Sequence, residues 1–314
     1  MNNPPKITVL LPVYNRDDYL CQAIKIVLGQ NFKDFELLII NDGSTDKSVE
    51  IVNSFKDNRI RLVNNEKNLG LIKTLNKGIE LAKGKYIARM DSDDICLGNR
   101  LGNQYNFMEA NPSITISGGW FRRINGKPGP VVKVATNPEE IKALLFFHTP
   151  IAHPTLIFNR ENMLKHKLYY NESYKHAEDF ELWVRASRLV NISNIKKVIL
   201  HYRIHPSQIT VASNKVQKEN LNRCRKNQIA ELGLTCSEAE FAIHEKLSNQ
   251  RYDTSLEFLL QVQDWLLKIN ERNRIVQLFN PRVFESVLGN YWLGACYSVR
   301  RHDKKALSVF NQSK

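Results

Sequence analysis

The sequence has no long apolar run, and this absence excludes an integral membrane protein. None of its 314 residues lie in a stretch that approaches the ~18 consecutive apolar residues needed to span a bilayer. The apolar run near the amino terminus, Ile7 to Leu11, is stopped by Pro12 and is too short for a signal peptide. We therefore expect the protein to stay in the cytoplasm.

Cysteines are few and are never arranged as C-x-x-C. The five of them are scattered: Cys21, Cys96, Cys224, Cys236 and Cys296. This pattern favours a reduced compartment and excludes a thiolate metal site. The sequence also lacks an internal repeat and a low-complexity linker. With 42% hydrophobic and 25% charged residues, it is typical of a globular chain that can bury an α/β core and carry an added subdomain.

Acidic residues are scarce in the later part of the chain, so its charge is uneven. The net charge is +13, yet residues 1–120 hold 15 Lys and Arg against 14 Asp and Glu. The basic excess beyond them suits nucleic acid, an anionic membrane surface or a phosphorylated substrate. Aromatics of the RNP type and zinc-finger spacing are both missing, so we do not expect a nucleic-acid partner.

The first third of the chain alternates apolar strands with amphipathic helices. Strands are predicted at 7–11, 35–40, 60–63 and 86–88, and helices at 19–28, 49–55 and 70–82. Continuous apolar strands separated by helices indicate an α/β fold with a mostly parallel sheet covered on both faces. Ligands bind at the carboxyl ends of such strands. Asn15, Asp42 and Asp91 each follow a predicted strand end.

The later chain changes character. Residues 114–205 mix strands and helices, whereas only helices are predicted beyond Ser207, at 215–232, 237–247, 255–269 and 282–299. We therefore predict a catalytic domain over residues 1–210 and a basic helical region over residues 211–314.

An acidic cluster follows the strand at 86–88. Its residues are Asp91, Ser92, Asp93 and Asp94. Three carboxylates in four residues repel one another unless a cation offsets them, and Mg²⁺ or Mn²⁺ is suited to such oxygen ligands. The alternative is a solvated turn that caps a helix near residues 99–109.

Two further acidic segments have both a structural and a functional interpretation. In the turn after 35–40, Ser44 can cap the next helix, but capping does not explain Asp42, which could accept hydrogen bonds from a base or ribose. Glu178 and Asp179 begin a helix, where either acid complements the helix dipole. A carboxylate held there against apolar neighbours could also act as a general base.

Several motifs in this order resemble glycosyltransferase family 2. They are P-V-Y-N (12–15), N-D-G-S-T-D (41–46), N-L-G (68–70), A-R-M-D-S-D-D (88–94), H-P-T (153–155), A-E-D-F-E-L-W (177–183) and Y-R-I-H (202–205). The resemblance covers about residues 5–210 and implies the GT-A fold with inverting transfer from a nucleotide sugar. The details are most similar to bacterial enzymes that add N-acetylglucosamine or galactose in β-1,3 linkage to lipooligosaccharide or O-antigen acceptors.

The resemblance also implies roles for individual residues. The positions where the family holds the nucleotide are Pro12, Tyr14, Asn15 and Asp42. Asp91 would face the ribose or the metal, Asp93 would ligate a divalent metal that bridges the diphosphate, and Ser92 would lie against the donor. Asp179 matches the family's catalytic base. His205 falls where some relatives supply a late metal ligand.

The chain departs from the family in one segment. Many members have Ala-Arg-Asn where this chain has Thr74-Leu75-Asn76. A basic contact expected from that arginine must come from Lys73 or Arg89, or be absent.

Competing interpretations remain open. A non-catalytic nucleotide-sugar-binding protein would have the same fold. A nucleotidyltransferase would use the same metal, but Glu178 and Asp179 would then have no evident function.

The helical region could dock the enzyme as a peripheral protein on the anionic inner membrane. That expectation rests on apolar stripes at 256–269 and 284–295 beside the basic Arg300, Arg301, Lys304 and Lys305. The alternative is that the stripes pack on the catalytic domain, and the last helix is the better candidate for the membrane.

Overall fold

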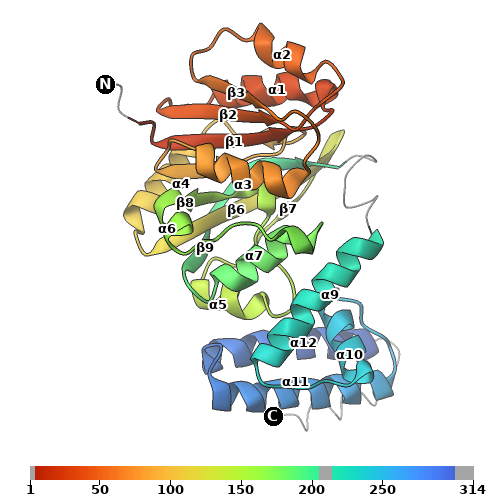
Figure 1. Ribbon diagram of the computed structural model, residues 1–314. Coiled ribbons are helices and arrows are strands. Elements are labelled where there is room, and N and C mark those ends of the chain that lie inside the picture. The colour runs from red at the N-terminus through yellow and green to blue at the C-terminus, as the bar shows by residue number, and fades with distance from the viewer. Residues whose placement is uncertain (1–3, 205–213, 301–314) are drawn as a thin grey trace. The chain divides into compact units, whose positions relative to one another are not determined.

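The protein consists of two compact units. The structure, a computed structural model, describes residues 4–204 and 214–300. One unit comprises residues 1–137 and 151–217 and has an α/β fold, and the other comprises residues 138–150 and 218–314 and is helical (Figure 1). The units therefore differ from the predicted division at residue 210, because the segment 138–150 belongs with the helices.

A single sheet forms the centre of the α/β unit. In the described residues it has nine strands in the order β3-β2-β1-β4-β8-β6-β9-β5, with β7 paired to β6. Their bounds are β1 Ile7–Val13, β2 Phe35–Asn41, β3 Ile60–Asn64, β4 Tyr86–Arg89, β5 Ile95–Cys96, β6 Ile114–Asn125, β7 Lys127–Val132, β8 Ile157–Asn159 and β9 Asn191–Arg203.

The helices of this unit cover both faces of the sheet. They are α1 Asp17–Leu28, α2 Ser48–Ser54, α3 Leu71–Leu81, α4 Arg100–Ala110, α6 Arg160–Lys165 and α7 Glu178–Ala186, with short turns η1 His153–Thr155 and η2 Glu172–Tyr174. One face of β1, including Val9 and Leu11, shares a core with Leu20 of α1 and Leu101 of α4. On the other face α3 approaches so closely that a Cβ at Gly78 would lie 2.4 Å from Leu10 Cδ1.

The strand directions change partway through the sheet. Strands β3, β2, β1 and β4 are parallel, as the strand–helix alternation predicted, and β6 is also parallel to β9. However, β8 is antiparallel to both β4 and β6, so the sheet is mixed rather than mostly parallel. The regular alternation of strand and crossover helix ends at Arg89, and antiparallel neighbours need no such crossover. The short β5 and the edge strand β7, which contains Pro128 and Pro130, were not predicted.

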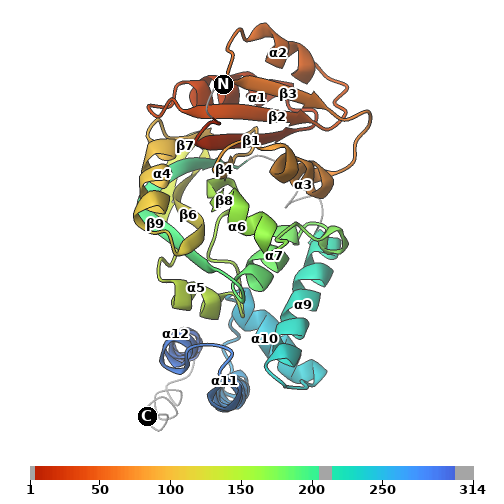
Figure 2. The ribbon, with the colours of Figure 1, turned by 60° about the vertical axis from the view of Figure 1, so that its left-hand side comes forward.

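The helical unit is built around an aromatic core. Its helices are α5 Pro138–Leu144, α10 Glu238–Ser248, α11 Leu256–Val276 and α12 Pro281–Arg300, together with most of α9 Asn214–Glu231. The long helices α11 and α12 lie side by side (Figure 2). Among the described residues, every helix is too short or too polar to cross a bilayer.

The apolar stripes predicted for a membrane surface are mostly buried in this core. The buried members are Leu259, Trp265, Leu266, Ile269, Phe284, Val287, Leu288, Tyr291 and Ala295. They pack against one another and against Phe146 and Phe147, so the apolar faces of these helices are buried within the helical unit itself.

The segment that follows α5 is bound into the helical unit through its backbone. Gln228 donates to the carbonyl of Leu145 at 2.9 Å, and Arg225 donates to that of Phe147 at 3.1 Å. His244 Nε2 lies 3.2 Å from the carbonyl oxygen of Phe146. Because buried carbonyls need partners, these long-range contacts fix the segment among the helices.

His244 is held in its neutral form. The indole N–H of Trp265 can only donate, and it points to His244 Nδ1 at 3.3 Å. The Nε2 atom therefore carries the proton and donates to Phe146. Burial, together with Arg225, lowers the pKa of His244 to about 3.

This burial predicts a pH-dependent stability. The folded pKa lies below the unfolded value, so the contribution of neutral His244 is complete above about pH 6.5 and is lost as the pH falls toward 3. Between pH 6.5 and pH 3, protonation of His244 in the unfolded chain should lower the free energy of unfolding by about 1.4 kcal/mol for each unit that the pH falls. We expect His244→Gln, which cannot titrate, to have a flatter dependence than the wild type between pH 7 and pH 4.5, measured by chemical denaturation. Parallel slopes for the two proteins would contradict this assignment.

Candidate active site

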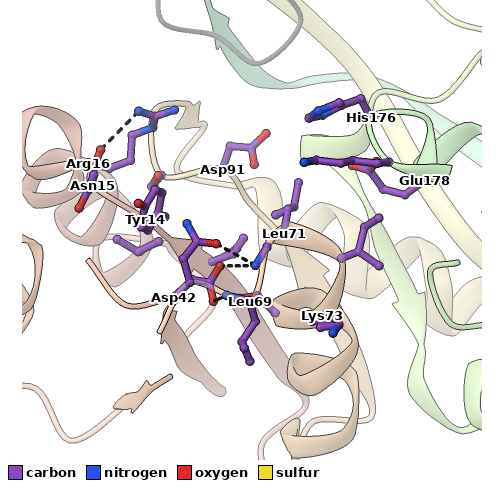
Figure 3. Close-up of a pocket in the computed structure, with 18 of the residues that line it drawn as sticks. Tyr14, Asn15, Arg16, Asp42, Leu69, Leu71, Lys73, Asp91, His176 and Glu178 are labelled. Atoms are coloured by element: carbon purple, nitrogen blue, oxygen red, sulfur yellow. Dashed lines mark hydrogen bonds between the residues drawn. The ribbon is translucent and has the colours of Figure 1, made fainter. Parts of the chain in front are cut away.

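The carboxyl ends of β1, β2 and β4 meet at one edge of the sheet and open onto a cavity of about 690 Å³. It is lined by Pro12, Val13, Tyr14, Asn15, Arg16, Asp42, Asn68, Leu69, Gly70, Leu71, Ile72, Lys73, Thr74, Arg89, Asp91, Ser92, Asp93, Glu172, Lys175, His176, Glu178 and Tyr202. In Figure 3, Tyr14, Asn15 and Arg16 lie on one side and Glu178 and His176 on the other, with Asp91 between them.

The loop after β1 is joined to the loop after β2 by hydrogen bonds. The backbone N–H of Asn15 donates to Ser44 Oγ at 3.0 Å, and the N–H of Thr45 donates to Asn15 Oδ1 at 2.9 Å. Asn15 has φ 49, a left-handed conformation that asparagine tolerates better than most residues. The two loops therefore form one wall of the cavity.

Asp42 organises a third loop at the same edge. Its carboxylate accepts a hydrogen bond from Asn65 Nδ2 at 2.8 Å. It also accepts hydrogen bonds from the backbone N–H groups of Leu69 and Gly70, each at 2.9 Å (Figure 3). The neighbouring Gly43 has φ +72, and a Cβ there would lie 2.7 Å from the carbonyl carbon of Lys67. A larger residue at position 43 would push the loop away from Asp42.

The acidic cluster after β4 brings three carboxylates together. Oxygen atoms of Asp91, Asp93 and Asp94 lie within 4.8 Å of one another. Asp94 is buried; its Oδ1 accepts from the backbone N–H of Arg203 at 2.9 Å, but its Oδ2 has no hydrogen-bond partner among the described residues. Burial and the charge of Asp91 raise the pKa of Asp94 well above its ordinary value. Such a cluster is stabilised by a bound cation.

Arg89 supplies a buried positive charge beside this cluster. Its side chain is only 4% exposed and forms an ion pair with Asp91, with Nη1 donating to Oδ2 at 2.7 Å. Burial raises the pKa of Asp91, and Arg89 opposes that rise. In contrast, Lys73 is half-exposed and lies 3.5 Å from Glu172, so this pair contributes little to stability.

Two acids begin α7 on the far side of the cavity. Glu178 lines the cavity although it is only 8% exposed, and its Oε2 has no hydrogen-bond partner among the described residues. Burial and the neighbouring Asp179 raise the pKa of Glu178 to about 7. Burial also raises the pKa of Asp179, whose Oδ1 accepts from the N–H of Phe180 at 2.7 Å.

Buried polar residues hold the segment that leads to these acids. His153 Nε2 lies 2.8 Å from the hydroxyl of Tyr170, and the ring of Trp183 packs against both. Burial lowers the pKa of His153 well below its ordinary value. The amide of Asn76 exchanges two hydrogen bonds of 2.9 Å with the backbone of Tyr170. The departure at Thr74-Leu75-Asn76 thus retains a structural asparagine.

The structure brings most of the predicted site residues to this cavity. Those that line it are Pro12, Tyr14, Asn15, Asp42, Lys73, Arg89, Asp91, Ser92 and Asp93. Asp179 is not among the lining residues, and His205 lies outside the described residues. Sequence reasoning did not assign a role to Arg16, although it directly follows P-V-Y-N, or to Tyr202, although it begins the motif Y-R-I-H. It also missed Lys175, which belongs to none of the motifs.

The burial of Glu178 predicts that its ionisation lowers the stability of the folded protein. Its folded pKa of about 7 exceeds the ordinary 4.5, so ionising it destabilises the fold progressively as the pH rises from 4.5 to 7. The shift corresponds to about 3 kcal/mol above pH 7, which exceeds the ~1 kcal/mol that a first-turn acid gains from the helix dipole. We therefore expect Glu178→Gln to be more stable than the wild type at pH 8, with the gain vanishing near pH 5.

Denaturant titrations at the two pH values measure this difference. Glu161, an exposed acid in the first turn of α6, offers a matched control, and Glu161→Gln should bring no gain at either pH. A loss of stability in Glu178→Gln at pH 8 would mean that Glu178 serves mainly to stabilise α7.

Comparison with known proteins identifies relatives of this chain. Residues 8–167 match the sequence profile of Glycosyl transferase family 2. An uncharacterized glycosyltransferase of Haemophilus influenzae is 31% identical over 241 residues, which cover 73% of this chain and 75% of that protein. The O-antigen biosynthesis glycosyltransferase WbnJ of Escherichia coli is 35% identical over 210 residues, 63% of this chain and 80% of its own.

Solved structures agree on the fold. The structure of S. aureus TarS in complex with UDP-GlcNAc superposes with a TM-score of 0.61 at 19% identity, over 98% of this chain and 92% of that one. The mannosyltransferase PcManGT from Pyrobaculum calidifontis, in complex with GDP-Man and Mn²⁺, has a TM-score of 0.57 at 15% identity, covering 94% and 87%. The predicted GT-A fold is thus confirmed, and the sequence matches establish that this chain is a glycosyltransferase of family 2.

Proposed function

We propose that this enzyme transfers a hexose, with N-acetylglucosamine or galactose favoured, from a UDP-sugar to a hydroxyl of a glycan acceptor with inversion. The observation that carries the proposal is that one cavity is lined by Asp42, by Asp91 and Asp93 of the acidic cluster, and by Glu178. Its volume of about 690 Å³ is in the range of sites for ligands of this size. The relationship to WbnJ supports a role in making lipooligosaccharide, O-antigen or capsule.

The donor would lie along the cavity with its nucleotide at the β1–β2 end. There Pro12, Tyr14, Asn15 and Asp42 would hold the base and ribose. Lys73, Arg89 and Ser92 would face the diphosphate. Lys73 is the more accessible of the two cations, because its side chain is half-exposed whereas that of Arg89 is buried.

The acidic cluster fits a divalent cation, Mn²⁺ or Mg²⁺. Asp91 and Asp93 would hold it. The buried Oδ2 of Asp94, which has no hydrogen-bond partner among the described residues, supports this proposal because it could also accept a ligand. His205, which is outside those residues, stays a proposed further ligand. When bound, such an ion stabilises negative charge on the departing diphosphate.

The transfer itself requires a base. We propose that Asp179 removes the proton of the acceptor hydroxyl while that oxygen attacks the anomeric carbon opposite the leaving group. The bond from the anomeric carbon to the diphosphate oxygen breaks in the same step, and UDP departs with the electron pair. A raised pKa suits Asp179 for this task, since a base must hold the proton it accepts.

Donor turnover tests both the function and the metal. With Mn²⁺ present, we expect slow release of UDP from UDP-GlcNAc or UDP-Gal, detected by mass spectrometry, and faster release when an acceptor is added. Chelator and Asp93→Asn should each abolish release, whereas Asp264→Asn, an exposed change on α11, should not. Full activity in excess chelator would contradict the metal proposal. Binding without any turnover would favour a non-catalytic nucleotide-sugar-binding protein.

The proposed base gives a separate prediction. Asp179→Asn keeps the size of the side chain and removes its basicity, so transfer should fall by roughly 10²–10⁴-fold. The affinity for UDP, measured by calorimetry, should stay nearly unchanged because Asp179 does not line the cavity. A more damaging effect of Glu178→Gln on turnover at saturating donor would assign the base to Glu178 instead.

We also propose that the helical unit docks on the anionic inner face of the membrane where lipid-linked acceptors are built. Four apolar side chains on its long helices are about half-exposed: Leu260, Leu267, Leu293 and Tyr297. Of the basic residues that motivated the prediction, Arg300 is the last residue of α12, and Arg301, Lys304 and Lys305 lie outside the described part of the chain. Each such charge near an anionic surface contributes ~1 kcal/mol.

Vesicle co-sedimentation tests the docking proposal. Binding should require anionic lipid and weaken as salt rises, because the charge contribution is screened. It should also fall when the four basic residues become Ser, or when Leu293 and Tyr297 become Ser. Equal binding to neutral vesicles, or none to anionic vesicles at low salt, would refute it.

A further inference from the structure

The acidic cluster lies in a short loop between β4 and β5, and the end of β9 lies beside that loop. β5 pairs with β9 in antiparallel register, with Ile95 opposite His201. β9 also pairs with β6 as far as Arg203, and the N–H of Ile204 donates to the carbonyl oxygen of Ile124 at 2.8 Å. Arg203 therefore stands on a strand that two neighbouring strands hold, next to a loop that has no ladder of its own.

Arg203 forms hydrogen bonds to two residues of the acidic loop. Its backbone N–H donates to Asp94 Oδ1 at 2.9 Å, and its side-chain Nε donates to the carbonyl oxygen of Asp93 at 2.7 Å. Asp94 Oδ2 has no hydrogen-bond partner among the described residues. Neither bond involves this Oδ2 atom or a carboxylate oxygen of Asp93, so neither competes with a cation for those atoms.

The far end of the Arg203 side chain is held by α1. Nη2 donates to Gln22 Oε1 at 2.9 Å, and the guanidinium carbon lies 4.8 Å from the centre of the Tyr19 ring. A planar guanidinium can donate several hydrogen bonds in a fixed geometry while it stacks on an aromatic ring, which a lysine ammonium cannot do. The side chain therefore connects three elements: the end of β9, the acidic loop and α1.

The other arginine at the cluster interacts with it in a different way. Arg89 forms its ion pair with the carboxylate of Asp91, so it shares those oxygen atoms with any bound cation. The hydrogen bonds of Arg203 instead fix the loop on which the cluster lies. Carboxylates this close together repel one another, and such repulsion favours a wider spacing unless the backbone is held.

We propose that Arg203 is a positioning residue for the divalent cation. It holds the loop so that oxygen atoms of Asp91, Asp93 and Asp94 stay within 4.8 Å of one another, close enough to bind one ion. Hydrogen bonds that orient metal ligands contribute to metal affinity nearly as much as the ligands do. This inference rests on the proposed function, because it requires a cation at the acidic cluster.

Metal binding tests the proposal without relying on turnover alone. Electron paramagnetic resonance, which detects free Mn²⁺, would follow titration of the metal into the wild type and each variant. Arg203→Ala should weaken Mn²⁺ binding roughly ten- to hundredfold. Arg203→Lys keeps the charge but loses the fixed geometry of the guanidinium, so it should recover part of that loss. Gln22→Ala, which leaves Arg203 in place, should bring a smaller loss in the same direction.

Two further measurements distinguish positioning from a merely structural role. Release of UDP by Arg203→Ala should need more Mn²⁺ but approach the wild-type rate at excess metal. Arg59 offers a matched control, because it also stacks on an aromatic ring, Phe35 at 4.7 Å, and donates to a carbonyl oxygen, that of Leu28 at 3.3 Å. Arg59→Ala should lower stability in denaturant titrations and leave Mn²⁺ affinity unchanged.

The outcomes separate this inference from the function beneath it. A wild type that binds no Mn²⁺ would overturn the proposed metal site and this inference with it. A wild type that binds Mn²⁺ while Arg203→Ala binds it equally well would overturn the inference alone. An equal loss of Mn²⁺ affinity in Arg59→Ala would mean general destabilisation and would also overturn it. A fall in turnover that excess Mn²⁺ does not reverse, at unchanged Mn²⁺ affinity, would assign Arg203 to substrate binding instead.

Discussion

The crowding of carboxylates at one edge of the sheet is the constraint on which the catalytic unit depends. Burial raises the pKa of Asp91, Asp94, Glu178 and Asp179, so each is held where its ionised form is disfavoured. The guanidinium of Arg89 offsets part of this charge from within the core. The surrounding α/β core maintains the arrangement, because the strands that carry it are almost fully buried. These buried carboxylates thus lower the stability of the fold at a site that is suited to binding cations and hydroxyl groups.

The loops at the opposite end of the cavity are ordered by a different device. Asp42 uses its carboxylate to fix the backbone of Leu69 and Gly70, while Asn15 and Ser44 join the two preceding loops. Irregular backbone needs such partners, since it lacks the ladders of helices and strands. The same polar side chains therefore shape the wall and present it to a ligand.

The helical unit is stabilised by its own core rather than by an external surface. The segment after α5 supplies Phe146 and Phe147 to that core, and its carbonyls are satisfied by Arg225, Gln228 and His244. After β7 the polypeptide leaves the α/β unit, contributes residues 138–150 to the helical unit, and returns to the α/β unit at residue 151. This connection explains why a simple division of the sequence into two consecutive domains does not describe the protein.

Much of the fold and site follows from local sequence pattern. The apolar strands and amphipathic helices up to Arg89 were predictable because their periodicity is local, and parallel strands bring Asn15, Asp42 and Asp91 to one edge. The ordered motifs identified the family for the same reason, since each is a short contiguous run. Tertiary structure alone decided the antiparallel direction of β8, the place of residues 138–150 and the burial of Arg89. It also decided that Glu178, rather than Asp179, lines the cavity. Each of these depends on contacts between residues far apart in the chain, or on the direction in which one side chain leaves its helix, and neither is encoded in local periodicity.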